Sequence, residues 1–361
     1  MLYEIFERVL SLEASGRRIV KMNVGEPTED IHPEILECMI KAIRSGKVRY
    51  TSSKGMAKLR REIAAIHGVN EDNVVITPGS KWGIYASIRV LLRDGGDVMV
   101  FAPFWPAYSL MVTDMGRHLE IVNLSFSGSS WMLDFNRLAE SLNRNIKLLI
   151  LNSPNNPTST MIKYDELKKL TELLDEFNIT VVADEAYIDL SFMEVKSLME
   201  LTSKCIVVRS FSKLFSMTGL RIGYVVADRE IANAIAKYNS ATITCIPEFI
   251  QEAALKALEL RDEISKYMVE KYRVRAEIAY SILTEAGFKV AKPEAGFYIF
   301  PKVNVDSNNF SLKLLEDEGI AVVPGSSFGG FNDFIRISLT VDNKSLTESL
   351  RRLVKYYERF R

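Results

Sequence analysis

Residues 210–221, with the sequence SFSKLFSMTGLR, place a lysine, hydroxyl side chains and an arginine directly after an apolar run. The amine of Lys213 can form a Schiff base with an aldehyde. The hydroxyls of Ser210 and Ser212 and the planar guanidinium of Arg221 are donors suited to phosphate oxygens. These residue types indicate a site for a phosphorylated aldehyde. On this segment alone, an exposed turn with a solvated lysine and arginine explains the pattern equally well.

Polar residues also follow three other apolar, β-branched runs. They are Gly79, Ser80 and Lys81, then residues 152–158, and then Asp184 and Tyr187. Ligands of parallel sheets bind beyond the carboxyl ends of the strands, so we expect these residues to meet at one edge. Each group has a simpler interpretation as a helix cap, a polar turn or a half-buried aromatic. Their coincidence at four strand ends favours one shared site.

The elements that must position these residues form a regular pattern. From about residue 73, β-branched runs alternate with amphipathic stretches, which is typical of βαβ units. We predict an α/β fold whose mostly parallel sheet of about seven strands is flanked by helices. The predicted strands lie at 73–77, 98–101, 119–122, 147–151, 180–183, 206–208 and 222–226.

After Pro247 the pattern changes to long charged helices and short strands, which indicates a smaller α+β domain. We expect the first residues of the chain to complete that domain. The predicted organisation is an N-terminal part of the small domain at 1–39, a large cofactor-binding domain at 40–258, and a C-terminal part of the small domain at 259–361.

Composition limits the possible partners. The 361 residues include 46 basic and 46 acidic side chains, with no long basic block, which argues against nucleic acid or an anionic membrane as a partner. The three cysteines and three histidines show no metal-ligand spacing, so no metal site is expected. The acidic N-terminus and the lack of an apolar run of about 18 residues predict a cytoplasmic protein without a membrane span.

Together with NVGEPTEDIHP from residue 23, YTSSKG from residue 50 and RISLT from residue 336, these segments resemble the class I aminotransferases. Those enzymes use pyridoxal 5'-phosphate (PLP) on a transferase fold of type I. The resemblance covers nearly the whole chain in collinear order, and it is strongest to the bacterial and archaeal aspartate aminotransferase-like branch. It implies ping-pong transfer of an amino group from an L-amino acid to the cofactor, and then to a 2-oxo acid.

The resemblance also implies roles around the cofactor ring. Lys213 would bond to the cofactor and then, once displaced by the substrate amine, move the proton of the α-carbon. Asp184 would pair with the protonated pyridine nitrogen. Asn156 and Tyr187 would hydrogen-bond the phenolate oxygen, and Trp105 would stack on the ring. Lys213, Asp184 and Tyr187 are the predicted catalytic residues.

The same resemblance implies how the phosphate is held. The predicted phosphate ligands are Gly79, Ser80, Lys81, Ser210, Ser212 and Arg221, of which the first three begin a helix. In the family, a tyrosine from a partner subunit completes this pocket. Tyr50 matches that tyrosine, which implies a homodimer with shared active sites. An ordinary exposed loop tyrosine is the alternative.

Recognition of the substrate is expected to depend on two cations. Arg336 matches the family's arginine for the α-carboxylate, with help from the Gly25 amide and the Asn156 side chain. Independently of the family, an arginine between two isoleucines of a strand is a costly place for an unpaired charge, which favours an anionic partner. Lys81 matches the residue that reaches the distal carboxylate in the aspartate-specific branch. We therefore slightly favour an acidic donor such as aspartate or glutamate, with 2-oxoglutarate as acceptor.

Some residues depart from the family pattern. Ser159 and Ser216 stand where glycine is usual, so a positive φ at either would carry a cost. Leu2 and Tyr3 replace small hydroxyl residues of the aspartate-specific branch, which leaves an aromatic or aliphatic donor open. A PLP-dependent carbon–sulfur β-lyase would use the same catalytic residues. A non-catalytic PLP-binding regulatory module is the alternative from another class.

Overall fold

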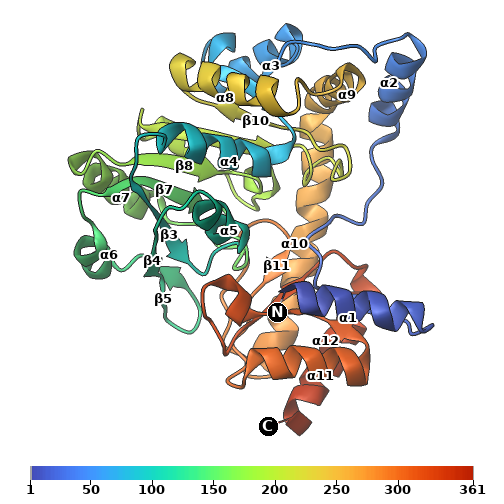
Figure 1. Cartoon of the computed structure of the whole chain (residues 1–361). Coiled ribbons are helices and arrows are strands. Elements are labelled where there is room, and N and C mark those ends of the chain that lie inside the picture. The colour runs from blue at the N-terminus through green and yellow to red at the C-terminus, as the bar shows by residue number, and fades with distance from the viewer. Residues whose placement is uncertain (1, 361) are drawn as a thin grey trace.

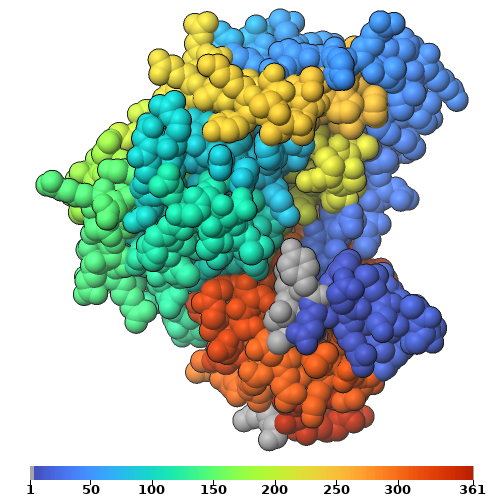
Figure 2. All heavy atoms as spheres, in the orientation of Figure 1, coloured from blue at the N-terminus to red at the C-terminus, as the bar shows by residue number. Residues whose placement is uncertain are grey.

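The computed structural model describes residues 2–360, and it shows a sheet-bearing part joined by one long helix to a smaller part. The long helix is α10, Arg261–Glu285, which runs from one part into the other (Figure 1). The blue atoms of α1 and the orange and red atoms of the C-terminal segments lie together beneath the sheet-bearing part (Figure 2). Among the described residues, no helix is both long and apolar enough to cross a membrane.

The central sheet has seven strands in the order β2-β10-β9-β8-β7-β3-β4. Their bounds are β2 (Val74–Thr77), β10 (Gly223–Val226), β9 (Cys205–Ser210), β8 (Thr180–Asp184), β7 (Ile146–Asn152), β3 (Asp97–Ala102) and β4 (Leu119–Asn123). Strand β10 is antiparallel to β2 and β9, and the other neighbouring strands of this sheet pair in parallel. The predicted α/β fold with a mostly parallel seven-stranded sheet is therefore confirmed.

The strands of this sheet have apolar side chains on both faces, and helices cover both faces. Val74 and Ile76 of β2 belong to one hydrophobic core and Val75 to another, as the alternation of side chains along a strand requires. The second core is formed with α4, α5 and α8, and Figure 1 shows α4 and α5 on the near side of the sheet. The helices of this part are α3 (Ala57–His67), α4 (Gly79–Leu91), α5 (Ala107–Asp114), α6 (Phe135–Ser141), α7 (Tyr164–Glu176), α8 (Arg229–Thr242) and α9 (Glu248–Glu259).

The smaller part combines both ends of the chain. Strand β1 (Val20–Lys21) pairs in parallel with β12 (Ile320–Ala321), so the N-terminal segment packs with the C-terminal one. A second small sheet has the order β11-β14-β13. The elements are α1 (Leu2–Ala14), β11 (Tyr298–Ile299), α11 (Ser307–Glu318), β13 (Val323–Pro324), β14 (Ile335–Ser338) and α12 (Asn343–Phe360), and the short hairpin β5 (Ser125–Phe126) with β6 (Trp131–Met132) precedes α6.

Helix α12 shows how sequence patterning places these elements. Leu346, Leu350, Leu353 and Tyr357 recur at helical spacing and are buried, so one stripe of the helix faces the core. The predicted domain boundaries are not tested by this packing and stay predictions. The boundary at residues 39 and 40 falls within α2 (Pro33–Arg44), and the boundary at residues 258 and 259 falls at the end of α9.

Candidate active site

A cavity of about 600 Å³ opens where the sheet meets the smaller part, which is a usual size for a small-molecule site. Its wall contains every predicted site residue except Gly79 and Tyr50. Those residues are Gly25, Ser80, Lys81, Trp105, Asn156, Asp184, Tyr187, Ser210, Ser212, Lys213, Arg221 and Arg336. The wall has four lysine or arginine side chains against two aspartate or glutamate side chains, so the cavity favours an anionic occupant.

The strand ends explain why these residues meet. Asn152, Asp184 and Ser210 are the last residues of β7, β8 and β9, which are parallel neighbours, so they emerge at the same edge. Ser80 and Lys81 belong to the first turn of α4, which follows β2. Arg336 and Gly25 come from the smaller part, so the cavity has walls from both parts of the molecule.

Lys213 lies in the loop after β9 and faces the cavity. Its Nζ donates a hydrogen bond of 2.6 Å to the carbonyl oxygen of Gly25. Burial, together with the positive charges of Arg336 and Arg221, lowers the pKa of Lys213 to about 8, although Glu26 and Asp184 oppose this. A substantial fraction of this amine is therefore neutral near pH 8, which is the form that attacks a carbonyl carbon or accepts a proton.

Asp184 is buried at the end of β8, with 4% of its surface exposed. Its Oδ2 accepts a hydrogen bond of 2.6 Å from the hydroxyl of Tyr108, and its Oδ1 accepts one of 3.2 Å from the amide of Ala186. Burial raises the pKa of Asp184 to about 6, and these hydrogen bonds limit the rise because they stabilise the ionised form. A carboxylate in this state can hold a cationic ring nitrogen near neutral pH.

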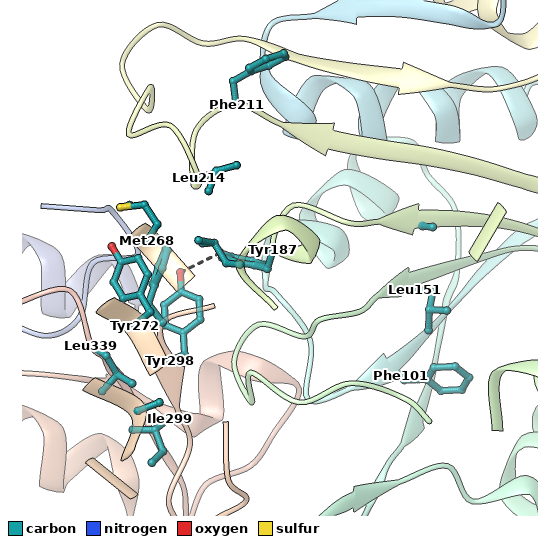
Figure 3. Close-up of a cluster of buried hydrophobic side chains, with 14 of the residues drawn as sticks. Phe101, Leu151, Tyr187, Phe211, Leu214, Met268, Tyr272, Tyr298, Ile299 and Leu339 are labelled. Carbon is teal, nitrogen blue, oxygen red and sulfur yellow. Dashed lines mark hydrogen bonds between the residues drawn. The ribbon is translucent and has the colours of Figure 1, made fainter. Parts of the chain in front are cut away.

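Asn156 and Tyr187 are held by further hydrogen bonds. The backbone amide of Asn156 donates to Oδ1 of Asn152 at 2.8 Å, and Nδ2 of Asn152 donates to the carbonyl of Asp184 at 2.8 Å. The hydroxyls of Tyr187 and Tyr298 share a hydrogen bond of 3.1 Å (Figure 3). Asn152 therefore ties the ends of two neighbouring strands together beneath the cavity.

Arg336 is a buried cation, with only 5% of its surface exposed. Within residues 4–360 it forms no ion pair with an acidic side chain. Its Nη1 donates to Oδ1 of Asn156 at 3.0 Å, and its Nη2 donates to the carbonyl of Asn23 at 2.7 Å. Its Nε is buried and has no hydrogen-bond partner in that part of the chain. A buried cation on the cavity wall without an acidic partner favours an anionic ligand.

Lys81 and Arg221 add two further cations. Nζ of Lys81 lies 4.9 Å from the ring centroid of Trp105, and burial together with the charge of Arg221 lowers the pKa of Lys81. Among the described residues, no acidic side chain pairs with Lys81. Arg221 has φ +51° and donates from Nη1 to the carbonyl of Thr218 at 2.8 Å. Such a left-handed arginine is strained by about 1–3 kcal/mol, which is common at functional sites.

Gly79 and Tyr50 lie outside the cavity wall for different reasons. Gly79 begins α4 with φ +79°, and a Cβ there would lie 2.5 Å from Nη2 of Arg221. Glycine is therefore needed for the arginine to approach the start of the helix. Tyr50 is 85% exposed and does not reach the cavity of its own chain. Its role in a partner's site stays a prediction.

Both serines that replace glycine have positive φ, at +55° for Ser159 and +53° for Ser216, so the expected backbone cost is confirmed. Oγ of Ser159 accepts a hydrogen bond of 3.0 Å from the amide of Tyr298. The hydroxyl of Ser216 has no hydrogen bond within residues 4–360. The prediction that leaves an aromatic or aliphatic donor open depends on Leu2 and Tyr3, whose side chains lie outside the described part of the structure.

Sequence reasoning missed several residues of the cavity. Asn23 and Asn152 begin the segments from residue 23 and residue 152 that carry predicted site residues, so these segments indicated their position. Tyr108 follows Trp105 at helical spacing, and the two rings are in edge contact with centroids 5.5 Å apart. Tyr298 gave no sequence signal. The other missed wall residues are Phe6, Glu7, Val24, Pro106, Ala186, Thr218 and Phe328.

These side chains fit PLP, the cofactor that the sequence resemblance implies. Lys213 supplies an amine with a lowered pKa, and Asp184 supplies a buried carboxylate. Arg221 and the free amides at the start of α4 supply donors for a phosphate. Arg221 can lie beside the start of α4 only because Gly79 has no side chain.

Comparisons with known proteins agree with this geometry. Residues 17–353 match the family model described as aminotransferase class I and II. The aspartate aminotransferase of Thermococcus kodakarensis is 36% identical over 97% of this chain and 90% of its own. A (5-formylfuran-3-yl)methyl phosphate transaminase of Methanocaldococcus jannaschii is 29% identical over 98% of this chain and 95% of its own. The crystal structure of the Thermotoga maritima aspartate aminotransferase superposes with a TM-score of 0.94 at 31% identity, covering 99% of this chain and 96% of that one.

Proposed function

Since the chain belongs to the class I and II aminotransferase family and is a PLP-dependent transaminase, we propose that its amino donor is an acidic L-amino acid. Aspartate or glutamate would give up the amino group, and a 2-oxo acid such as 2-oxoglutarate would receive it. Relatives at 36% and 31% identity are named aspartate aminotransferases, which supports this donor class. The observation that carries the proposal is the position of Lys81.

A dicarboxylic substrate needs two cations, and Arg336 and Lys81 are cations of the cavity wall that have no acidic partner among the described residues. Arg336 would bind the α-carboxylate through its guanidinium, which lines the cavity. Lys81 would then meet the distal carboxylate from the other wall, where its Nζ already lies against Trp105. Burial makes the Lys81 charge unfavourable on its own, so a nearby anion would stabilise it.

PLP supplies an electron sink for the negative charge that develops at the α-carbon of a bound amino acid. We propose that Nζ of Lys213 would hold this cofactor through its aldehyde carbon and that, once the substrate amine has displaced it, the free amine would take the proton from the α-carbon of the substrate. Its lowered pKa keeps the amine available as a base. The carbonyl of Gly25, which accepts its hydrogen bond, would hold Nζ in the cavity before it reacts.

Three residues would hold the cofactor ring. The carboxylate of Asp184 would pair with the ring nitrogen, and the hydroxyl of Tyr187 would bond to the ring oxygen. Nδ2 of Asn156 would donate to the same oxygen, since Oδ1 of that amide already accepts from Arg336. One asparagine would thereby connect the cofactor to the arginine that binds the substrate.

The remaining wall residues would hold the phosphate and the ring face. Ser80, Ser210 and Ser212 offer hydroxyls, and Arg221 offers a guanidinium beside the start of α4. Trp105 would stack on the ring face. The negative phosphate would then lie beside the guanidinium of Arg221 and the start of α4.

We also propose that a second copy of the chain covers the loop around Tyr50. Three large apolar side chains are exposed near this loop, at 85% for Tyr50, 60% for Val48 and 45% for Ile43. An exposed group of apolar side chains favours contact with another protein surface. Tyr50 would then reach the phosphate of the neighbouring subunit. A cytoplasmic location fits the free state of Cys38, Cys205 and Cys245.

The donor class is tested by a panel of amino acids on the purified holoenzyme and its Lys81→Met variant. We expect the variant to lose about tenfold to a hundredfold in kcat/KM for aspartate, because a hydrogen bond to a charged group contributes about 1.5–3 kcal/mol. The kcat/KM for phenylalanine should be unaffected. The ratio of the kcat/KM values for aspartate and phenylalanine corrects for any loss of active protein. Equal losses for both donors would contradict the role of Lys81.

A further inference from the structure

The guanidinium of Arg336 lies over two aromatic rings. Its Cζ is 4.5 Å from the ring centroid of Tyr298 and 5.1 Å from that of Phe328. Contact with ring faces restricts the plane of a guanidinium and leaves its edges for hydrogen bonds. Two of those edges already donate to Asn156 and Asn23. The position of the Tyr298 ring therefore influences where the guanidinium of Arg336 points.

Tyr298 is itself fixed at three points. It pairs with Ser338 across β11 and β14, which places it diagonally from Arg336 on the same face of that sheet. Its hydroxyl bonds to Tyr187 at 3.1 Å, and Figure 3 shows the two side chains directed toward each other. That hydroxyl also packs on Gly25, where a Cβ would lie 1.8 Å from it.

The third point is the backbone amide of Tyr298, which donates to Oγ of Ser159 at 3.0 Å. Ser159 is 2% exposed, and its carbonyl accepts hydrogen bonds from the amides of Glu294 and Ala295 at 2.8 and 3.2 Å. Glycine would adopt the positive φ of this position without strain, but it has no side chain to accept the buried amide. The hydroxyl of Ser159 therefore compensates for an unfavourable backbone.

We propose that Ser159 and Tyr298 form a positioning pair, in which the serine hydroxyl holds Tyr298 so that its ring orients Arg336 toward the α-carboxylate of the substrate. This inference rests on the proposed function, because it requires Arg336 to bind that carboxylate. The pair links the loop after β7 to strand β11, so it joins the two walls of the cavity. Neither residue would contact the reacting atoms in this role.

The first test uses the holoenzyme and its Ser159→Gly and Ser159→Ala variants. A carboxylate contact present in both ground and transition states affects KM more than kcat. We expect both variants to raise KM about tenfold for aspartate and for phenylalanine, with kcat changed by less than about threefold. Ser216→Gly is the matched control, because it relieves a similar positive φ at a serine whose hydroxyl has no hydrogen bond among the described residues. Its KM values should match those of the wild type.

A second pair of variants separates the ring of Tyr298 from its hydroxyl. Tyr298→Phe keeps the ring over Arg336, so we expect KM within about twofold of the wild type, whereas Tyr298→Leu should raise KM about tenfold for both donors. Unchanged KM in Ser159→Gly and in Tyr298→Leu, or an equal rise in Ser216→Gly, would overturn the positioning pair alone. A wild-type enzyme that transaminates no amino acid would overturn the proposed function and this inference together.

Discussion

The hydroxyl of Tyr108 donates a hydrogen bond of 2.6 Å to Oδ2 of Asp184, and both side chains are buried. Two effects on Asp184 oppose each other. Burial favours the neutral acid, whereas the hydrogen bond favours the carboxylate, and the result is a pKa of about 6. The pKa of Tyr108 is raised well above its ordinary value by burial and by Asp184, so it stays a donor. We infer that Tyr108 keeps Asp184 ionised near neutral pH.

Replacing this tyrosine should make cofactor binding more sensitive to acid. Without the donor, the pKa of Asp184 in the cofactor-free protein rises, by about one pH unit if the bond contributes about 1.4 kcal/mol. Tyr108→Phe should then bind PLP about fivefold more weakly than the wild type at pH 6 and almost equally at pH 8. Equilibrium titration of the cofactor-free protein at both pH values measures this.

Tyr85→Phe is the control for that experiment, because Tyr85 donates to Asp114 at 3.1 Å on the protein surface. It should leave the binding of PLP unchanged at both pH values. An identical loss for Tyr108→Phe at pH 6 and at pH 8 would show that Tyr108 acts by packing and has no effect on the protonation of Asp184.

Asp184 should also make the cofactor-free protein less stable as the pH rises. Its native pKa of about 6 exceeds the unfolded value of 3.8, so the native state binds more protons between these values. Stability is therefore lost as the pH rises from about 4 to 6, and the loss is about 3 kcal/mol at 1.36 kcal/mol per pH unit. Asp184→Asn should be more stable than the wild type by about that amount at pH 8 and nearly equal to it at pH 4.

Urea unfolding of the cofactor-free proteins at both pH values gives the comparison. If Asp184→Asn were less stable than the wild type at pH 8, the carboxylate would be a structural group.

The fold and most of the site could be predicted because their signals are local. Runs such as Val74–Thr77 and Thr180–Asp184 are β-branched and buried, and chemistry-bearing residues directly follow them. The edge of a parallel sheet then brings these residues together without further information. This is why Asp184, Ser210 and Lys213 were found from strand ends.

Other features depend on contacts that no local pattern encodes. Tyr108 reaches Asp184 from a helix that packs on the sheet, and Tyr298 reaches Arg336 from a neighbouring strand that lies 38 positions earlier in the sequence. The positive φ of Ser159 could be suspected from the family pattern. Its hydrogen bond to an amide 139 positions away in the sequence could not, because it depends on how the two parts of the molecule meet.

Lys213 is predicted to be the residue that bonds to the cofactor. Lys213→Ala should lose turnover by a factor of about 10⁴ or more, since it removes both the nucleophile and the base. Borohydride reduction followed by mass spectrometry should attach the cofactor to the wild-type peptide that contains Lys213 and leave the variant unmodified. Lys81→Ala removes another lysine of the same cavity and should still be modified at Lys213. Modification at Lys81 in the wild type would contradict the assignment.

Arg336 should bring substrate affinity at the expense of stability, and the two effects can be measured on one variant. Arg336→Met removes a buried charge that has no acidic partner among the described residues, so the cofactor-free protein should unfold at a higher urea concentration. The same variant should lose about tenfold to a hundredfold in kcat/KM for aspartate and phenylalanine alike, because both donors carry an α-carboxylate. A loss confined to aspartate would mean that Arg336 recognises the side chain. A loss of stability together with activity would mean that Arg336 stabilises the fold. A residue that serves only to bind a ligand should instead destabilise the protein when that ligand is absent.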